Sequence, residues 1–178
     1  MNIGFIGTGK ITSSVITGIC QSKIRYNKIF ISKRNNRISN SLKKKFKKIV
    51  IKKDNQEIIN NCKWIFLAVT PTVGEKIIRK LKFRRNQIIV SFISTITIPK
   101  LKQMIKVKTD IVRAIPLPPI SLKKGPVPIF PANKKVKNFF DKIGDCIEIK
   151  NENLSLNFWA ASSLMAPYYE LLNNVSKW

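Results

Sequence analysis

Apolar residues recur along this chain in two alternating patterns, as short continuous runs and as stripes spaced by three or four residues. The runs are typical of strands buried on both faces, and the stripes are typical of helices that bury one face. The runs lie at 3–6, 28–31, 49–51, 64–69, 87–92 and 110–115. Helical patterns lie between them, at 11–19, 37–46, 54–59, 71–81 and 97–105. Strands that alternate with helices predict an α/β fold with a doubly wound parallel sheet, a Rossmann fold.

Three helix starts carry recognisable capping signals. Asp54 followed by Glu57 has the pattern of a capping box, in which each residue satisfies a free amide of the first turn. Pro71 occupies a first helical position, where its missing N–H costs nothing. We expect the helix after residue 92 to be capped near Thr97 and Pro99.

A glycine-rich turn follows the first strand and opens the first helix, over residues 7–12. Gly7 would allow a tight turn, and Gly9 would let the backbone approach a phosphate within hydrogen-bonding distance. Free N–H groups and the positive end of the helix dipole would attract a pyrophosphate. Thr12 occupies the place of the third glycine of the dinucleotide fingerprint, so the helix is expected to pack slightly further from the strand. The alternative is a tight turn that binds nothing.

The second strand ends at Ser32, Lys33 and Arg34. In a Rossmann fold this position meets the adenosine ribose, where an acidic residue selects NAD. A hydroxyl and two cations suit a 2′-phosphate instead, so we predict NADP as the cofactor, with NAD possible. The alternative is that the two cations belong to a general excess of basic residues.

Residues 151–178 predict a long helix interrupted at Pro167. Its apolar stripe consists of Phe158, Ala161, Leu164 or Met165, Tyr168, Leu171 or Leu172, Val175 and Trp178. So wide an apolar surface, which also includes Trp159, is unstable in water unless it folds back or dimerises. An ordinary helix packed on its own sheet is the alternative. We therefore divide the chain into a dinucleotide-binding Rossmann domain, 1–150, and the first helix of a helical dimerisation and substrate domain, 151–178.

Composition agrees with a globular protein, since 44% of the 178 residues are apolar. The formal charge of +25, with a dense basic run at 43–48, raises binding to nucleic acid or to an anionic membrane as hypotheses. Aromatic residues do not interleave with that run as a single-strand platform requires, so we favour a solvated face in a lysine-biased chain. No apolar run is long enough to span a membrane, and the start lacks a secretory signal, which predicts a cytoplasmic protein.

Candidate side-chain chemistry is sparse. There is no histidine, and the three cysteines, Cys20, Cys62 and Cys146, lie far apart. This excludes Cys/His zinc sites and Ser-His or Cys-His nucleophile pairs, and we predict no metal. Each cysteine is interpreted as a small buried hydrophobe. Any chemistry would therefore depend on a cofactor.

Taken together, the motifs resemble those of pyrroline-5-carboxylate reductases over nearly the whole chain. The matching segments are 4–11, Ser32-Lys33-Arg34, Asn55-Gln56-Glu57, Ala68-Val69-Thr70-Pro71, Val90-Ser91 and 112–116. Two segments depart from that family. Leu117-Pro118-Pro119 replaces Asn-Thr-Pro, and 163–169 keeps a serine, the proline and a tyrosine but loses two glycines and a second serine.

The resemblance implies hydride transfer from NAD(P)H to the carbon of a cyclic imine, which converts pyrroline-5-carboxylate to proline. The cofactor-binding residues that we predict are Gly7, Thr8, Gly9, Lys10, Ile11, Ser32, Lys33, Arg34, Asn55, Ala68, Val69, Thr70 and Pro71. Ser162 and Ser163 are the candidates for holding the substrate carboxylate, and no catalytic residue is assigned. A homodimer through the C-terminal helix is also implied. Two alternatives remain open, an inactive NADP-binding remnant of the family and a basic nucleic-acid-binding protein on a Rossmann scaffold.

Overall fold

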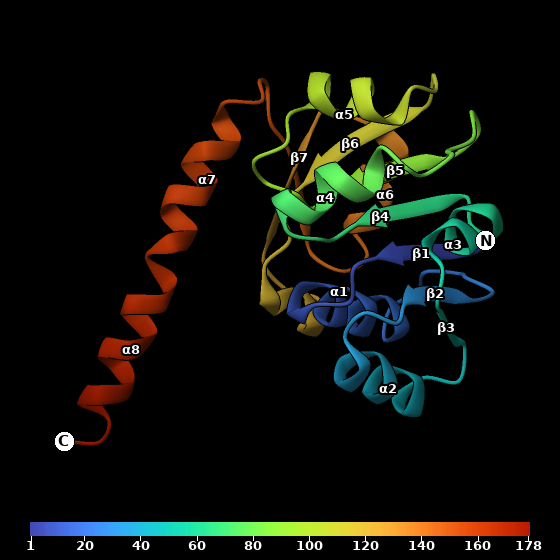
Figure 1. Ribbon diagram of the computed structural model, residues 1–178. Helices are drawn as coiled ribbons and strands as arrows, with labels where there is room; N and C mark the ends of the chain where they lie inside the picture. The colour runs from blue at the N-terminus through green and yellow to red at the C-terminus, as the bar shows by residue number, and fades with distance from the viewer.

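An eight-stranded sheet lies at the centre of the fold, with helices on both faces (Figure 1). The computed structural model describes residues 1–178, apart from the side chains of Leu156, Trp159 and Ala166. The strands are β1 (Ile3–Ile6), β2 (Ile29–Ser32), β3 (Ile49–Lys52), β4 (Trp64–Leu67), β5 (Ile88–Ser91), β6 (Asp110–Ala114), β7 (Pro126–Phe130) and β8 (Asp145–Glu148). The helices are α1 (Lys10–Cys20), α2 (Asn36–Lys45), α3 (Asn55–Asn61), α4 (Pro71–Ile78), α5 (Ile98–Ile105), the 3-10 helix η1 (Pro118–Leu122), α6 (Lys134–Phe140), α7 (Leu154–Ser163) and α8 (Met165–Val175).

The strand order is β3-β2-β1-β4-β5-β6-β7-β8, and it confirms the predicted doubly wound sheet. All neighbouring pairs from β3 to β6 are parallel, whereas β7 runs antiparallel to β6 and parallel to β8. β1 pairs with β2 on one side and with β4 on the other. The chain therefore reverses its direction of winding beside β1, and ligands of such sheets bind at the carboxyl ends of the strands at this point.

Two apolar layers hold the helices on the sheet. In one layer α1, α2 and α6 pack on an aromatic cluster, in which the rings of Phe5 and Phe66 stack with centroids 4.6 Å apart. Trp64 stacks on Phe139 in the same layer at 4.8 Å. The other layer contains side chains of α3, α4 and α5 around Ile65. Burial on both faces explains why the strands are nearly continuous apolar runs.

The structure corrects several local predictions. The fourth strand ends at Leu67, so that 68–70 form a loop, and α4 ends at Ile78. Asp54 caps α3 by accepting from the Gln56 amide, but Glu57 pairs with Lys52 instead of completing the capping box.

The strands and helix between residues 126 and 148 were not predicted. Pro126 and Pro128 lie in β7, and prolines argue against a strand in the middle of a sheet. The structure accommodates them because β6 pairs only with Ile129 and Phe130, at the end of β7, and takes no amide from either proline. Pro128 contributes its carbonyl instead, which accepts from the Ile115 amide at 3.0 Å.

The C-terminal helices project from the rest of the fold (Figure 1). They meet at Leu164, which is earlier than predicted, because Pro167 lies in the first turn of α8, where its missing N–H needs no partner. Among the described side chains of α8, that of Met165 is partly buried and the others are exposed. For α8 the alternative of a helix packed on its own sheet is therefore wrong, whereas α7 buries Ser155 and half-buries Leu154 and Phe158. Trp159, which the sequence adds to the apolar surface of this helix, lies outside the described side chains.

In the described part of the chain, no helix combines the length and the apolar character that crossing a bilayer requires.

Candidate functional site

The turn between β1 and α1 depends on a glycine at residue 7. Gly7 has φ +101°, and a Cβ there would lie 2.2 Å from the carbonyl oxygen of Ala68. Gly9 differs, because a Cβ built on it meets no atom within 4 Å. Gly9 is also the N-cap of α1, and no side chain caps that helix. The backbone at Gly9 therefore borders open space, with the uncapped first turn of α1 and the positive end of the helix dipole behind it.

Three hydroxyl groups fix the shape of this turn. The Gly7 amide donates to Ser32 Oγ at 2.9 Å, and the Thr8 hydroxyl donates to the Ser32 carbonyl at 2.7 Å. Thr12, which replaces the third glycine of the fingerprint, is fully buried and donates its hydroxyl to the Gly7 carbonyl at 2.8 Å. The turn is thus held in place without any use of the amides that follow Gly9.

Two adjoining clefts open beside this turn at the carboxyl end of the sheet. One has a volume of about 460 Å³ and is lined by Gly7, Thr8, Gly9, Arg34, Asn35, Asn36, Ala68, Val69 and Thr70. The other has a volume of about 340 Å³ and is lined by Gly7, Ser32, Lys33, Arg34, Asn36, Lys53, Asn55, Val69 and Ile77. They share Gly7, Arg34, Asn36 and Val69, so together they form one elongated groove, which we call the nucleotide cleft.

The nucleotide cleft is positively charged at one end. Lys33, Arg34 and Lys53 line that end, and all three are exposed. The described residues that line the cleft include no carboxylate. Asn36, the first residue of α2, also lines this end, so the start of a second helix faces it, and Asn35 caps that helix by accepting from the Ile38 amide at 3.2 Å. The arrangement suits an elongated ligand that carries several negative charges.

The structure brings most of the predicted cofactor-binding residues together. Ten of them line the nucleotide cleft, and whether they bind a cofactor stays a prediction: Gly7, Thr8, Gly9, Ser32, Lys33, Arg34, Asn55, Ala68, Val69 and Thr70. Lys10, Ile11 and Pro71 lie next to it without lining it.

The two substrate candidates do not reach the nucleotide cleft. Ser162 and Ser163 lie at the end of α7, and the exposed Ser163 donates its hydroxyl to the Ala160 carbonyl at 2.7 Å. That bond is typical of a serine inside a helix.

The predicted cofactor-binding residues did not include Asn35, Asn36, Lys53 and Ile77, which also line the cleft. Lys53 could have been found from its place just after the third strand. Because β3 pairs in parallel with β2, the carboxyl ends of the two strands lie side by side, which brings Lys53 next to Ser32 and Lys33. In a chain with 34 lysines and arginines, one further lysine did not stand out.

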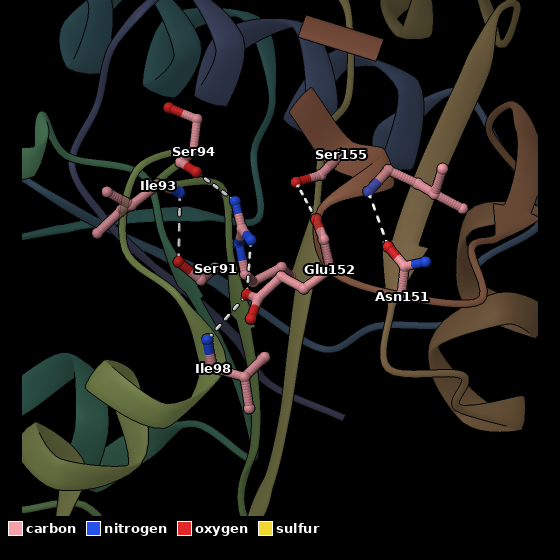
Figure 2. Close-up of polar contacts among 9 residues, drawn as sticks. Ser91, Ile93, Ser94, Ile98, Asn151, Glu152 and Ser155 are labelled. Atoms are coloured by element: carbon pink, nitrogen blue, oxygen red, sulfur yellow. Dashed lines mark hydrogen bonds and ion pairs between the residues drawn. The ribbon is translucent and has the colours of Figure 1, made fainter. Parts of the chain in front are cut away.

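A buried ion pair ties the segment before α7 to the carboxyl end of the sheet. Arg113, whose side chain is 6% exposed, donates to Glu152 at 2.6 Å and also to the Ser94 carbonyl. Figure 2 shows the Glu152 carboxylate beside the start of α5, where it accepts from the Ile98 amide at 2.9 Å. Glu152 therefore caps α5 in place of the predicted Thr97, which makes no side-chain cap.

The cysteines offer no activated thiol. Burial raises the pKa of Cys62 to about 12. Burial, together with the carboxylate of Asp141, raises the pKa of Cys146 to about 12. Burial also raises the pKa of Cys20. All three thiols are protonated near neutral pH, where a thiol is a poor nucleophile and a poor metal ligand.

Comparison with protein families matches residues 2–95 to the family described as NADP oxidoreductase, coenzyme F420-dependent. The chain belongs to this family. Among curated proteins, pyrroline-5-carboxylate reductase 3 of Danio rerio is 30% identical to this chain over 128 residues, which cover 70% of this chain and 44% of the zebrafish protein. The predicted resemblance to pyrroline-5-carboxylate reductases is thereby confirmed. The chain spans less than half the length of that relative.

Solved structures of such reductases share the fold. The enzyme from Coxiella burnetii superposes with a TM-score of 0.80 at 22% identity, over 98% of this chain and 68% of that one. Pyrroline carboxylate reductase from Plasmodium falciparum, solved with NADP bound, superposes with a TM-score of 0.78 at 23% identity. That match covers 99% of this chain and 67% of the Plasmodium chain.

Proposed function

We propose that this protein binds NADP(H) in the nucleotide cleft and uses it to reduce a cyclic imine, pyrroline-5-carboxylate, to proline. The observation that carries the proposal is the open space at Gly9, beside first-turn amides that no side chain caps. Free amides at a helix start are a general binding site for phosphate. Related proteins are named for this reaction, and one of them was solved with NADP bound.

The residues of the cleft fit a dinucleotide along its length. The backbone from Thr8 to Ile11 would hold the pyrophosphate. Lys33, Arg34 and Lys53 would hold the 2′-phosphate that distinguishes NADP from NAD, and the absence of a lining carboxylate among the described residues of this end favours NADP. Ser32 is already bonded to Gly7 and Thr8, so we assign it to shaping the turn.

When bound, the nicotinamide would supply a hydride for the carbon of the C=N bond. The protein then needs to orient the ring, hold the substrate and exclude water. No histidine or acidic residue is required if the imine arrives protonated.

The substrate side of the site would be completed by a second copy of the chain. Ser162 and Ser163 lie on a projecting helix. Leu164, at the junction of α7 and α8, and Tyr168, Leu171 and Val175 of α8 are each exposed by at least 58%. Apolar surface of this extent is unstable in water. We propose a homodimer through α7 and α8, which would bury it.

A second candidate is an NADP-binding protein without reductase activity. It is favoured by the substitutions at 117–119 and at 163–169, and because neither Ser162 nor Ser163 lines the nucleotide cleft.

Oxidation of NADPH in the presence of pyrroline-5-carboxylate separates the two candidates. Steady turnover supports the reductase. Saturable NADPH binding without turnover supports the second candidate, and the absence of saturable binding removes both. The cofactor's own fluorescence is the suitable reporter, because Trp64 lies buried at the amino end of β4, away from the cleft.

A further inference from the structure

Basic residues stand just before the parallel strands and gather along the amino edge of the sheet, at the opposite end from the nucleotide cleft. Lys28, Lys48 and Lys63 immediately precede β2, β3 and β4. Arg85 and Lys108 lie shortly before β5 and β6. Because parallel strands start at the same edge, their order in the sheet arranges these side chains as a row. We call these five residues the amino-edge cations.

Two of the clefts along this edge share a lining residue. The larger has a volume of about 440 Å³ and is lined by Lys63, Arg85, Asn86, Gln87, Ile88, Lys108, Thr109, Asp110 and Lys135. The smaller has a volume of about 270 Å³ and is lined by Met1, Lys23, Ile24, Arg25, Trp64, Lys135, Asn138, Phe139 and Lys142. Lys135 borders both, so the basic surface is continuous from one cleft to the other.

Among the described residues no carboxylate pairs with an amino-edge cation, although Lys48 lies over the Tyr26 ring at 5.2 Å and donates to the Tyr26 carbonyl at 3.4 Å. Asp110 is the one carboxylate among the described residues that line the two clefts. Lys28, Lys63, Arg85 and Lys108 are all exposed. Mutual repulsion along such a row destabilises the protein slightly and attracts an anionic partner.

The shape of the row selects the kind of anion. Neighbouring strands lie about 4.8 Å apart, so six parallel strands spread the cations over roughly 24 Å along a line. A linear polymer with regularly repeated phosphates matches this line, whereas a small anion would meet only part of it. A membrane surface fits poorly, because among the described residues that line the clefts Met1 is the one exposed large apolar side chain, at 38%.

We propose that the amino edge of the sheet binds the phosphate backbone of a single-stranded nucleic acid. The exposed amides of Asn86 and Asn138 add neutral donors beside the cations. The dense run at 43–48 lies beside one end of this surface, because the last turn of α2 carries Lys43, Lys44 and Lys45 and leads into Lys48 just before β3. The proposal does not depend on the protein's being a reductase, because it concerns the opposite end of the sheet.

The test compares two variants that lose the same charge from different surfaces. One carries Lys63→Gln, Arg85→Gln and Lys108→Gln at the edge. The control carries Lys123→Gln and Lys124→Gln, between η1 and β7, and Lys177→Gln after α8, all three of them exposed. Binding of a fluorescent single-stranded oligothymidylate is followed by anisotropy at several salt concentrations. Each lost phosphate contact lowers the slope of log affinity against log salt by about 0.7, so the edge variant should lose about 2 units of slope and roughly tenfold or more in affinity. The control should stay within about twofold of the parent.

Three results would overturn the proposal. Equal weakening in both variants would mean that only net charge matters. Displacement of the oligonucleotide by NADPH would mean that it occupies the nucleotide cleft, since the amino edge is remote from the cofactor. Edge-dependent binding to phosphatidylserine vesicles without oligonucleotide binding would assign the surface to membranes. If the triple variant does not fold, Lys63→Gln and Arg85→Gln alone should each lower the slope by about 0.7, and unchanged slopes would refute the proposal.

Discussion

Replacing Gly9 by alanine adds a single methyl group, which should weaken phosphate binding and leave the stability of the fold nearly unchanged. Gly9 has an extended backbone with φ −98°, and its added Cβ meets no protein atom within 4 Å. Alanine is a poorer N-cap than glycine by about 0.5–1 kcal/mol. It also restricts the unfolded chain, which stabilises by about 0.4–1 kcal/mol. These effects nearly cancel, so we expect the free energy of unfolding to change by less than about 1 kcal/mol. The melting temperature should therefore shift by no more than about 2–4 °C.

The same methyl group projects into the space that we assign to the pyrophosphate. Losing one hydrogen bond to a charged group costs about 1.5–3 kcal/mol, which corresponds to roughly 10- to 150-fold in the dissociation constant. Thermal unfolding measures the first effect, and calorimetric titration with NADPH measures the second. Gly7→Ala is the contrasting variant, because its Cβ would lie 2.2 Å from the Ala68 carbonyl oxygen and should prevent stable folding. A stable Gly9→Ala protein with the parent's NADPH affinity would refute the phosphate site.

Four further predictions concern single groups. Lys53→Gln should weaken NADPH binding by roughly threefold to tenfold and leave NADH binding unchanged, as calorimetry with both cofactors would test. Ser32→Ala leaves a buried amide of the glycine turn without its acceptor, and chemical unfolding should record a loss of about 1–3 kcal/mol. Cys62, whose pKa burial raises from 9.0 to about 12, should stay unreactive toward thiol reagents near pH 8 until urea unfolds the chain. Rapid labelling of the native protein at pH 8 would contradict the burial of Cys62. The contribution of the protonated Cys62 thiol to stability is complete below pH 9 and is lost as the pH rises toward 12. Glu152→Ala should destabilise by about 3–5 kcal/mol because it leaves Arg113 charged and buried, and additive effects in a cycle with Arg113→Leu would contradict the pairing.

The central sheet was predictable because its strands are buried on both faces. The run at 64–69 has no polar position, and β4 lies inside the sheet between β1 and β5. The glycine turn was predictable for a local reason, since Gly7 adopts a backbone conformation that other residues rarely take.

Contacts between distant segments could not be predicted from local pattern. The Arg113–Glu152 pair joins residues 39 positions apart, and nothing in either neighbourhood indicates the other. Lys53 and the amino-edge cations were hidden for a different reason. Lysine is common throughout the chain, so only the order of the strands reveals which lysines lie side by side. The elements between 126 and 148 were obscured by Pro126 and Pro128, which a strand tolerates only where its partner needs no amide from them.

The most direct test of the account follows each backbone amide by NMR while NADPH is added to the isotopically labelled protein. The account predicts saturable shifts at one site, largest for the amides of Thr8 to Thr12 and accompanied by shifts at Lys33, Arg34 and Lys53. Titration with NADH should move the first group and leave the second nearly unchanged. Shifts confined to other regions, or none at millimolar NADPH, would contradict the claim that the turn after β1 is a phosphate site.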